Sequence, residues 1–235
     1  YQYIMKKTVL LTGSSSGIGK AICDLLLQNN FHVIGVCRHP DCFDHKHYTP
    51  IVCDLSKVAQ IEQIFKPLLK NHLMIDVAIL NAGVPIFGFI EQQSVKTIVN
   101  AIEMNLTSHL ILSRLLLPIL KRQQRSHLIF MGSESALQGG QQGSLYCAAK
   151  FGLRGFAQSL RQECAHSNVY ISTIHPGMVK TSFFDNLYFE PGDQPENVVD
   201  VGDIAKTVLQ IITSQTGSVF DEVVISPLKK VVKKK

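Results

Sequence analysis

Short apolar runs alternate with longer amphipathic segments along the whole chain, and this alternation restricts the fold more than any other feature. The short runs, most of them continuously apolar as buried strands are, lie at 8–11, 32–37, 50–53, 75–80, 127–131, 170–174 and 219–225. The segments with helical periodicity lie between them, at 17–29, 57–71, 94–122, 146–166 and 201–213. Parallel neighbouring strands need crossover connections, and helices of this length supply them. The sequence therefore predicts an α/β fold: a doubly wound parallel sheet of about seven strands with helices on both faces.

The chain has 235 residues without an internal repeat or a linker-like segment, which predicts one domain over 1–235. Residues 1–5, which include a candidate start at Met5, are left out of the argument. The net charge of +5 comes from a basic tail, 228–235, which holds five lysines. Because the rest of the chain has no net charge, we expect no nucleic-acid binding, and we expect the tail to be solvated and frayed.

Apolar runs and cysteines indicate the surroundings of the protein. No apolar run reaches the roughly 18 residues that a membrane span requires, so we expect no membrane association. Six cysteines without a CxxC pair predict reduced thiols in a cytoplasmic protein rather than a disulfide framework. The spacing of Cys42, His45, His47 and Cys53 could suit zinc, but Cys53 ends a predicted strand and is expected to point into the core. We therefore predict no metal site.

The carboxyl ends of the strands form the ligand-binding edge of such a sheet. The residues that follow predicted strands are 13–19, Arg38, Asp54, 81–83, Ser133 and 176–181. The first group belongs to a glycine-rich turn, TGSSSGIG at 12–19, which opens a predicted helix. Glycine lets the backbone approach a pyrophosphate, and a helix N-terminus offers N–H groups without helical partners. The turn therefore predicts phosphate binding.

Tyr146 and Lys150 are four positions apart, so they share one face if this segment is helical. A nearby ammonium would lower the pKa of a phenol from about 10 toward 7. Such a phenol could exchange a proton with an alcohol or a carbonyl oxygen near neutral pH. On spacing alone, an ordinary surface pair is the commoner explanation of this pattern.

Several motifs, taken in order, resemble those of the short-chain dehydrogenase/reductase family in its compact single-domain branch. They are TGSSSGIG at 12–19, Asp54, NAG at 81–83, Asn105, Ser133, YCAAK at 146–150 and PGMVKT at 176–181. The resemblance extends over about 7–227. It implies a Rossmann-like fold and the transfer of a hydride between a nicotinamide cofactor and a substrate.

The resemblance also implies roles for single residues. Tyr146 would be the general acid in reduction or the base in oxidation, and Lys150 would lower its pKa and bind the nicotinamide ribose. Ser133 would stabilise the charge that develops on the substrate oxygen, and Asn105 would hold a water that connects Lys150 to solvent. The residues implied to line the cofactor are Gly13, Ser15, Ser16, Ile18, Arg38, Asp54, Leu55, Asn81, Gly83, Tyr146, Lys150, Pro176, Val179 and Thr181.

The end of the second predicted strand indicates which nicotinamide is bound. An NAD site needs a carboxylate there to accept hydrogen bonds from the ribose 2′-hydroxyl. Cys37 occupies this position, and Arg38, which is suited to a 2′-phosphate, follows it. We therefore predict NADP(H) rather than NAD, although 14–16 lacks the basic residue that many NADP-binding relatives carry in the turn.

Together these inferences predict an NADPH-dependent reductase of the carbonyl or 3-hydroxy acid type, acting on a small-molecule carbonyl or alcohol. An NAD-dependent secondary alcohol dehydrogenase and a non-catalytic NADP-binding regulatory protein remain as alternatives. The specificity segment, 182–199, is rich in aromatic residues, which predicts an apolar lid. Its four carboxylates argue against strong attraction for an anionic substrate: Asp185, Glu190, Asp193 and Glu196. The apolar helix faces in 94–122 and 146–166 predict a homodimer or homotetramer.

Overall fold

A parallel sheet of seven strands forms the centre of the computed structural model, which describes residues 7–39, 43–70 and 74–235. Its strands are β1 (Thr8–Thr12), β2 (His32–Cys37), β3 (Tyr48–Val52), β4 (Val77–Leu80), β5 (Ser126–Met131), β6 (Val169–Pro176) and β8 (Glu222–Ile225). Their order is β3-β2-β1-β4-β5-β6-β8, so the direction of winding reverses between β1 and β4. This is the Rossmann-like arrangement that the sequence predicts, with strand bounds that differ by at most three residues from those expected.

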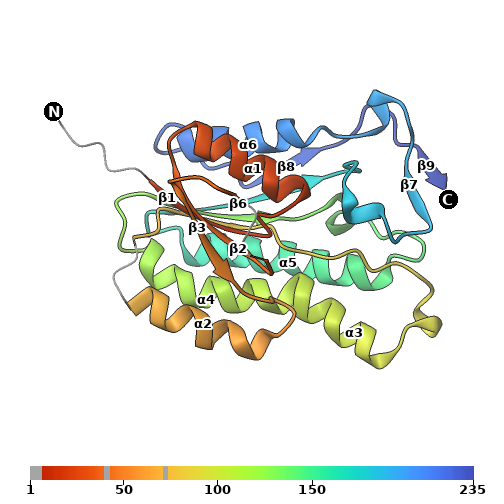
Figure 1. Cartoon of the computed structure of the whole chain (residues 1–235), viewed down its shortest axis with the longest axis horizontal. Coiled ribbons are helices and arrows are strands. Elements are labelled where there is room, and N and C mark those ends of the chain that lie inside the picture. The colour runs from red at the N-terminus through yellow and green to blue at the C-terminus, as the bar shows by residue number, and fades with distance from the viewer. Residues whose placement is uncertain (1–6, 40–42, 71–73) are drawn as a thin grey trace.

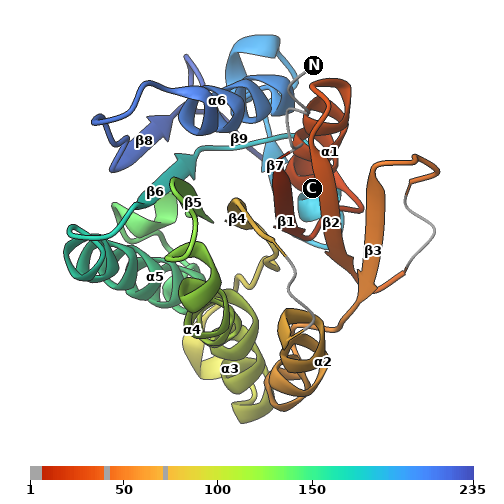
Figure 2. The same ribbon diagram turned by 90° about the vertical axis from the view of Figure 1, so that its left-hand side faces the viewer.

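Helices cover both faces of the sheet (Figures 1 and 2). On one face lie α1 (Gly17–Gln28) and α6 (Val201–Thr213), which contact each other. On the other face lie α2 (Val58–Lys70), α3 (Val95–Ile102), α4 (Ser108–Leu120) and α5 (Ser144–Glu163). The two layers close over two separate apolar clusters, one on each side of the sheet.

Strand β1 shows why the predicted strands are apolar at every position. Val9 and Leu11 belong to the cluster under α1 and α6, whereas Leu10, between them, belongs to the cluster under α2, α4 and α5. All three side chains are fully buried. Because successive side chains of a strand point to opposite faces, a strand covered on both sides carries no polar alternation.

The segment 94–122, predicted as one helix, is divided in the structure. One turn of π-helix, Glu103–Thr107, lies between α3 and α4. Within it, the side-chain Nδ2 of Asn105 donates to the carbonyl oxygen of Ala101 at 3.1 Å. This contact occupies a carbonyl that would accept a backbone N–H in a regular α-helix, and π-bulges of this kind are frequent at functional sites. The widened turn fixes Asn105 toward the sheet edge described below.

The prediction of a frayed basic tail is wrong. Strand β9 (Val232–Lys234) pairs with β7 (Phe189–Pro191) as an antiparallel ribbon at one end of the molecule (Figure 1). The ammonium groups of Lys229 and Lys233 lie 3.0 and 2.9 Å from carboxylates of the specificity segment. The positive charges of Lys229 and Lys233 are therefore compensated by carboxylates of the specificity segment, which precedes the tail by up to 40 residues. Residues 1–5, set aside above, lie outside the described residues.

Within 7–39, 43–70 and 74–235, no helix combines the length and the apolar character that crossing a bilayer demands.

Candidate active site

A cleft of about 1940 Å³ lies at the carboxyl edge of the sheet. Every residue that the sequence predicts for the cofactor or for catalysis lines this cleft, except Asn105. The walls come from the glycine turn, from the segments after β2, β3, β4 and β5, from α5, and from the segment after β6. The rule that ligands bind outside the strand ends therefore locates the cleft correctly.

The glycine turn brings the start of α1 against the end of β1. Gly13 has a φ of +68°, which glycine adopts without strain. A Cβ at Gly19 would overlap the carbonyl oxygen of Gly13, so only glycine allows this approach. The side chain of Ser16 makes no capping hydrogen bond, and the first turn of α1 holds no acidic residue. The N–H groups and dipole of this helix end thus fit a pyrophosphate in the cleft.

Thr12, which the sequence motifs did not single out, joins the turn to β4. Its buried Oγ1 accepts hydrogen bonds from the backbone N–H groups of Asn81 and Ala82, at 2.9 and 3.0 Å. The Asn81 amide returns two bonds, to the carbonyl oxygens of Thr12 and Gly13. The position of Thr12 could have indicated this role. A threonine between a buried strand and a glycine-rich turn has a buried hydroxyl, and a buried hydroxyl needs a hydrogen-bond partner.

Tyr146 and Lys150 lie together on α5 and are both buried. The Lys150 Nζ lies 5.7 Å from the centre of the Tyr146 ring and donates to the carbonyl oxygen of Met131 at 2.9 Å. Burial lowers the pKa of Lys150 to about 8 and raises the pKa of Tyr146 well above its usual value of 10. In this structure the lost hydration of the phenolate outweighs the contacts that lower the pKa of Tyr146, so the net shift is upward.

Ser133 stands beside Tyr146, at the start of a short 3-10 helix, Glu134–Ala136. A hydrogen bond between the Ser133 hydroxyl and the Tyr146 phenol lowers the pKa of Tyr146, against the larger effect of burial. The ring centres of Phe87 and Phe183 lie 5.3 and 5.8 Å from that of Tyr146. The hydroxyls of Ser133 and Tyr146 therefore lie together, next to the rings of Phe87 and Phe183.

Asn105 lies behind the wall of the cleft rather than in it. Its Oδ1 accepts from the backbone N–H of Val84 at 3.0 Å, and the side chain is fully buried. Asn105 and Lys150 both lie close to Gly83. A Cβ at Gly83 would lie 3.0 Å from Asn105 Oδ1 and 3.7 Å from Lys150 Nζ. Asn105 therefore holds the segment after β4 close to Lys150.

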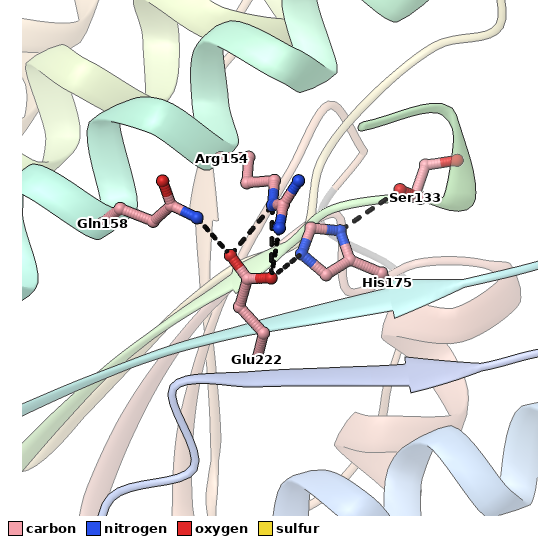
Figure 3. Close-up of polar contacts among 5 residues, drawn as sticks. All are labelled: Ser133, Arg154, Gln158, His175 and Glu222. Carbon is pink, nitrogen blue, oxygen red and sulfur yellow. Dashed lines mark hydrogen bonds and ion pairs between the residues drawn. The ribbon is translucent and has the colours of Figure 1, made fainter. Parts of the chain in front are cut away.

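His175 is buried in β6 and contacts the backbone of Ser133 (Figure 3). Its Nδ1 donates to the Ser133 carbonyl oxygen at 3.2 Å, and its Nε2 lies 3.9 Å from Glu222. Glu222 is held in turn by two nitrogens of Arg154 and by Gln158 (Figure 3). Burial lowers the pKa of His175, which favours a neutral ring with its proton on Nδ1. His175, which Glu222 and Arg154 hold in turn, therefore fixes the position of the Ser133 backbone.

We expect Arg154→Gln to reduce the free energy of unfolding at pH 7 by about 1–2 kcal/mol, because it leaves a partly buried carboxylate without its bidentate partner. Arg154 lowers the pKa of Glu222 from 4.5, so this stabilisation is present above pH 4.5 and is lost as the pH falls through the lowered pKa. Urea unfolding at pH 7 and pH 3.5 measures it. The control is Arg161→Gln, whose partner Asp221 has a side chain 67% exposed. Equal losses in the two variants at pH 7 would contradict the expectation.

The described residues contain no group of three His, Cys, Asp or Glu side chains placed to hold a metal ion. Cys53 is buried in the core, as expected from its place at the strand end. Cys42, the first member of the cluster considered above, lies outside the described residues.

Comparison with known proteins agrees with this geometry. Residues 7–190 match the family model described as short chain dehydrogenase. The 3-oxoacyl-(acyl-carrier-protein) reductase of Buchnera aphidicola is 30% identical over 190 residues, which cover 78% of each chain. Carbonyl reductase family member 4 of Xenopus laevis is 26% identical over 221 residues, 89% of this chain and 92% of that protein. An alcohol dehydrogenase of the archaeon Thermococcus sibiricus, solved with 5-hydroxy-NADP, is 22% identical with a TM-score of 0.85, covering 96% of this chain and 99% of that one. With its sheet order, its glycine turn and these matches, the chain belongs to the short-chain dehydrogenase family of oxidoreductases.

Proposed function

We propose that this oxidoreductase binds a nicotinamide dinucleotide, with NADP(H) preferred, and reduces a carbonyl group of a small molecule to an alcohol. The observation that carries the proposal is the meeting of Ser133 and Tyr146 in the cleft that also contains the glycine turn. The glycine turn can hold the phosphates of a dinucleotide, and Tyr146 can donate a proton in the same cleft. Carbonyl reduction requires both, because it transfers a hydride and a proton. The names of the relatives, two reductases and an alcohol dehydrogenase, support the same class.

In this proposal the cofactor lies along the strand ends. The N-terminus of α1 holds the pyrophosphate, Asp54 and Leu55 adjoin the adenine, and Asn81 and Gly83 pass beside the adenine ribose. Pro176, Val179 and Thr181, which line the cleft after β6, would hold the carboxamide end. When bound, the nicotinamide supplies the hydride in reduction and accepts it in oxidation.

The chain's own groups handle the proton. The Ser133 hydroxyl donates a hydrogen bond to the substrate oxygen, where negative charge develops. Tyr146 gives its phenolic proton to that oxygen, and its raised pKa keeps it protonated at neutral pH. Lys150, with a pKa of about 8, is charged at pH 7 and stabilises the phenolate that remains. This assignment favours reduction at neutral pH. Asn105 is a positioning residue, because both ends of its amide bind backbone groups.

Arg38 is proposed to select NADP(H) by binding the 2′-phosphate. It lines the cleft directly after β2, next to Cys37 in the position where an NAD site needs a carboxylate. We expect Arg38→Ala to raise the Kd for NADPH about 10-fold and to change the Kd for NADH less than about 2-fold. Enhancement of nicotinamide fluorescence on binding measures both constants.

The matched control for this prediction is Lys57→Ala. Arg38 and Lys57 both lower the pKa of Asp54, but Lys57 does not line the cleft. The control should leave both constants unchanged. An equal loss of NADH and NADPH affinity in Arg38→Ala would refute the assignment and would favour the NAD-dependent alternative.

The proposed function is tested by following nicotinamide absorbance with a panel of ketones, aldehydes and hydroxy acids and with both cofactors. Turnover of carbonyl substrates with NADPH is the expected result. Tight NADPH binding without turnover over the whole panel would instead identify a non-catalytic NADP-binding protein.

We also propose that the protein assembles into an oligomer through α3 and α5. Three apolar side chains of α3 and α5 are exposed: Val95 (77%), Val99 (47%) and Phe151 (43%). This exposure supports a homodimer or homotetramer that covers these helices, which sedimentation velocity would detect.

The cysteines support a cytoplasmic location with reduced thiols. Those that the structure describes are all buried: Cys23, Cys37, Cys53, Cys147 and Cys164.

A further inference from the structure

The ribbon of β7 and β9 forms one wall of the cleft at its substrate end. Its register pairs Phe189 with Lys234 and Glu190 with Lys233. Directly opposed residues of an antiparallel pair point to the same face, and successive residues point to opposite faces. Phe189 and Lys234 line the cleft, whereas Glu190 and Lys233 do not. The ribbon therefore turns one lysine inward and its neighbour outward.

The carboxylates of the specificity segment do not face the substrate. None of the four lines the cleft. Glu196 and Asp193 bind Lys229 and Lys233 at 3.0 and 2.9 Å, and Glu190 lies 3.8 Å from Lys233. Lysines of the tail therefore pair with three of these carboxylates, Glu190, Asp193 and Glu196, outside the lining of the cleft.

Basic side chains outnumber acidic ones among the described residues that line the cleft. Among the described residues, those that line it with charged side chains are Arg38, Asp54, Glu134, Lys150, Lys230 and Lys234. The first two adjoin the proposed adenine half. Glu134 and Lys230 form an ion pair at 2.7 Å, and Lys150 is buried against Met131. Lys234 is exposed in the substrate half of the cleft, and none of the ion pairs among the described residues includes it.

Aromatic rings connect the reacting end of the cleft to this lysine. The ring centre of Tyr146 lies 5.3 Å from that of Phe87, and Phe87 lies 5.1 Å from Phe189. Phe189 is the direct partner of Lys234 in the ribbon. A substrate with its carbonyl at Tyr146 would run along these rings and end at the ammonium.

We infer that Lys234 is a specificity-determining residue that binds a substrate carboxylate remote from the reacting carbonyl. The substrate class is then an apolar oxo acid, with an alkyl or aryl spacer between the ketone and the carboxylate. The inference rests on the proposed reductase function, and it names one end of the substrate that this function leaves open.

The test uses the methyl-ketone acids 5-oxohexanoate, 7-oxooctanoate and 9-oxodecanoate, each compared with its methyl ester. We expect the wild type to favour at least one acid over its ester in kcat/KM, and Lys234→Gln to reduce that preference about 5- to 10-fold while ester turnover stays constant. The matched control is Lys233→Gln, on the same strand but facing outward, which should keep the preference. Added salt should weaken the preference in the wild type and in Lys233→Gln, but not in Lys234→Gln.

An acid-to-ester preference that is the same in Lys234→Gln and the wild type would overturn the inference while leaving the reductase proposal intact. If no carbonyl compound is turned over, the reductase proposal fails, and calorimetry with octanoate and octanamide on NADP-saturated protein decides about Lys234 separately. Weaker octanoate binding in Lys234→Gln, with octanamide unchanged, supports the inference. Equal octanoate affinity in the two proteins overturns it.

Discussion

Tyr146→Phe is expected to lower kcat/KM for carbonyl reduction by about 10³-fold and to leave the Kd for the nicotinamide cofactor within about 2-fold. The substitution removes only the hydroxyl, which lies beside Ser133 and is the proposed proton donor. Its ring packs between Phe87 and Phe183, and Phe keeps those contacts. Steady-state kinetics and fluorescence titration of the cofactor measure the two effects.

The control for this prediction is Tyr188→Phe. Tyr188 also lines the cleft, but it is 45% exposed and packs on Phe189 rather than beside Ser133. Its variant should keep most of the activity. If Tyr146→Phe retained more than about a tenth of the wild-type kcat/KM, another group would have to supply the proton.

Lys150→Met is expected to lose about 10²- to 10³-fold in kcat/KM and yet to unfold at a higher urea concentration at pH 7. Burial lowers the pKa of Lys150 from 10.5 to about 8, so folding disfavours its charged form. A methionine of similar length avoids this cost, but it leaves the carbonyl oxygen of Met131 without the Lys150 donor. We expect a net gain of about 1–3 kcal/mol in the free energy of unfolding.

The pH dependence separates this explanation from a general packing effect. Between pH 8 and 10.5 the unfolded lysine binds a proton that the folded one has lost, so wild-type stability rises with pH through this window. The advantage of Lys150→Met should therefore shrink between pH 7 and pH 10. Lys206→Met replaces a lysine whose side chain is 73% exposed, and it should show no such trend. A variant that is less stable than the wild type at pH 7 would contradict the expectation.

The fold was predictable because each central strand is covered on both faces. Val9, Leu10 and Leu11 must all be apolar when two helical layers enclose β1, and this requirement is visible in the sequence. The position of the cleft was predictable for a related reason, since the strand ends identify one edge of the sheet. Residues with reactive side chains, such as Ser133, follow those ends within two residues.

Features that depend on distant partners were not predictable. The direction of the Tyr146 pKa shift depends on burial under rings from two other segments. The order in the basic tail depends on carboxylates as far away as Glu134, 96 residues before Lys230. The contact of His175 with the Ser133 backbone joins residues 42 positions apart. Helical or strand periodicity carries no information about such pairs.

The pairing of β7 with β9 matters for any work with fusion proteins. Because Lys234 lines the cleft, polypeptide attached after Lys235 would emerge at its mouth, next to Phe184, whose carbonyl oxygen accepts from the Lys235 ammonium. A purification tag at that end would compete with substrate for space and would add its own charges to the entrance. Kinetic constants measured with a tag attached directly to Lys235 would therefore describe the tag as well as the enzyme.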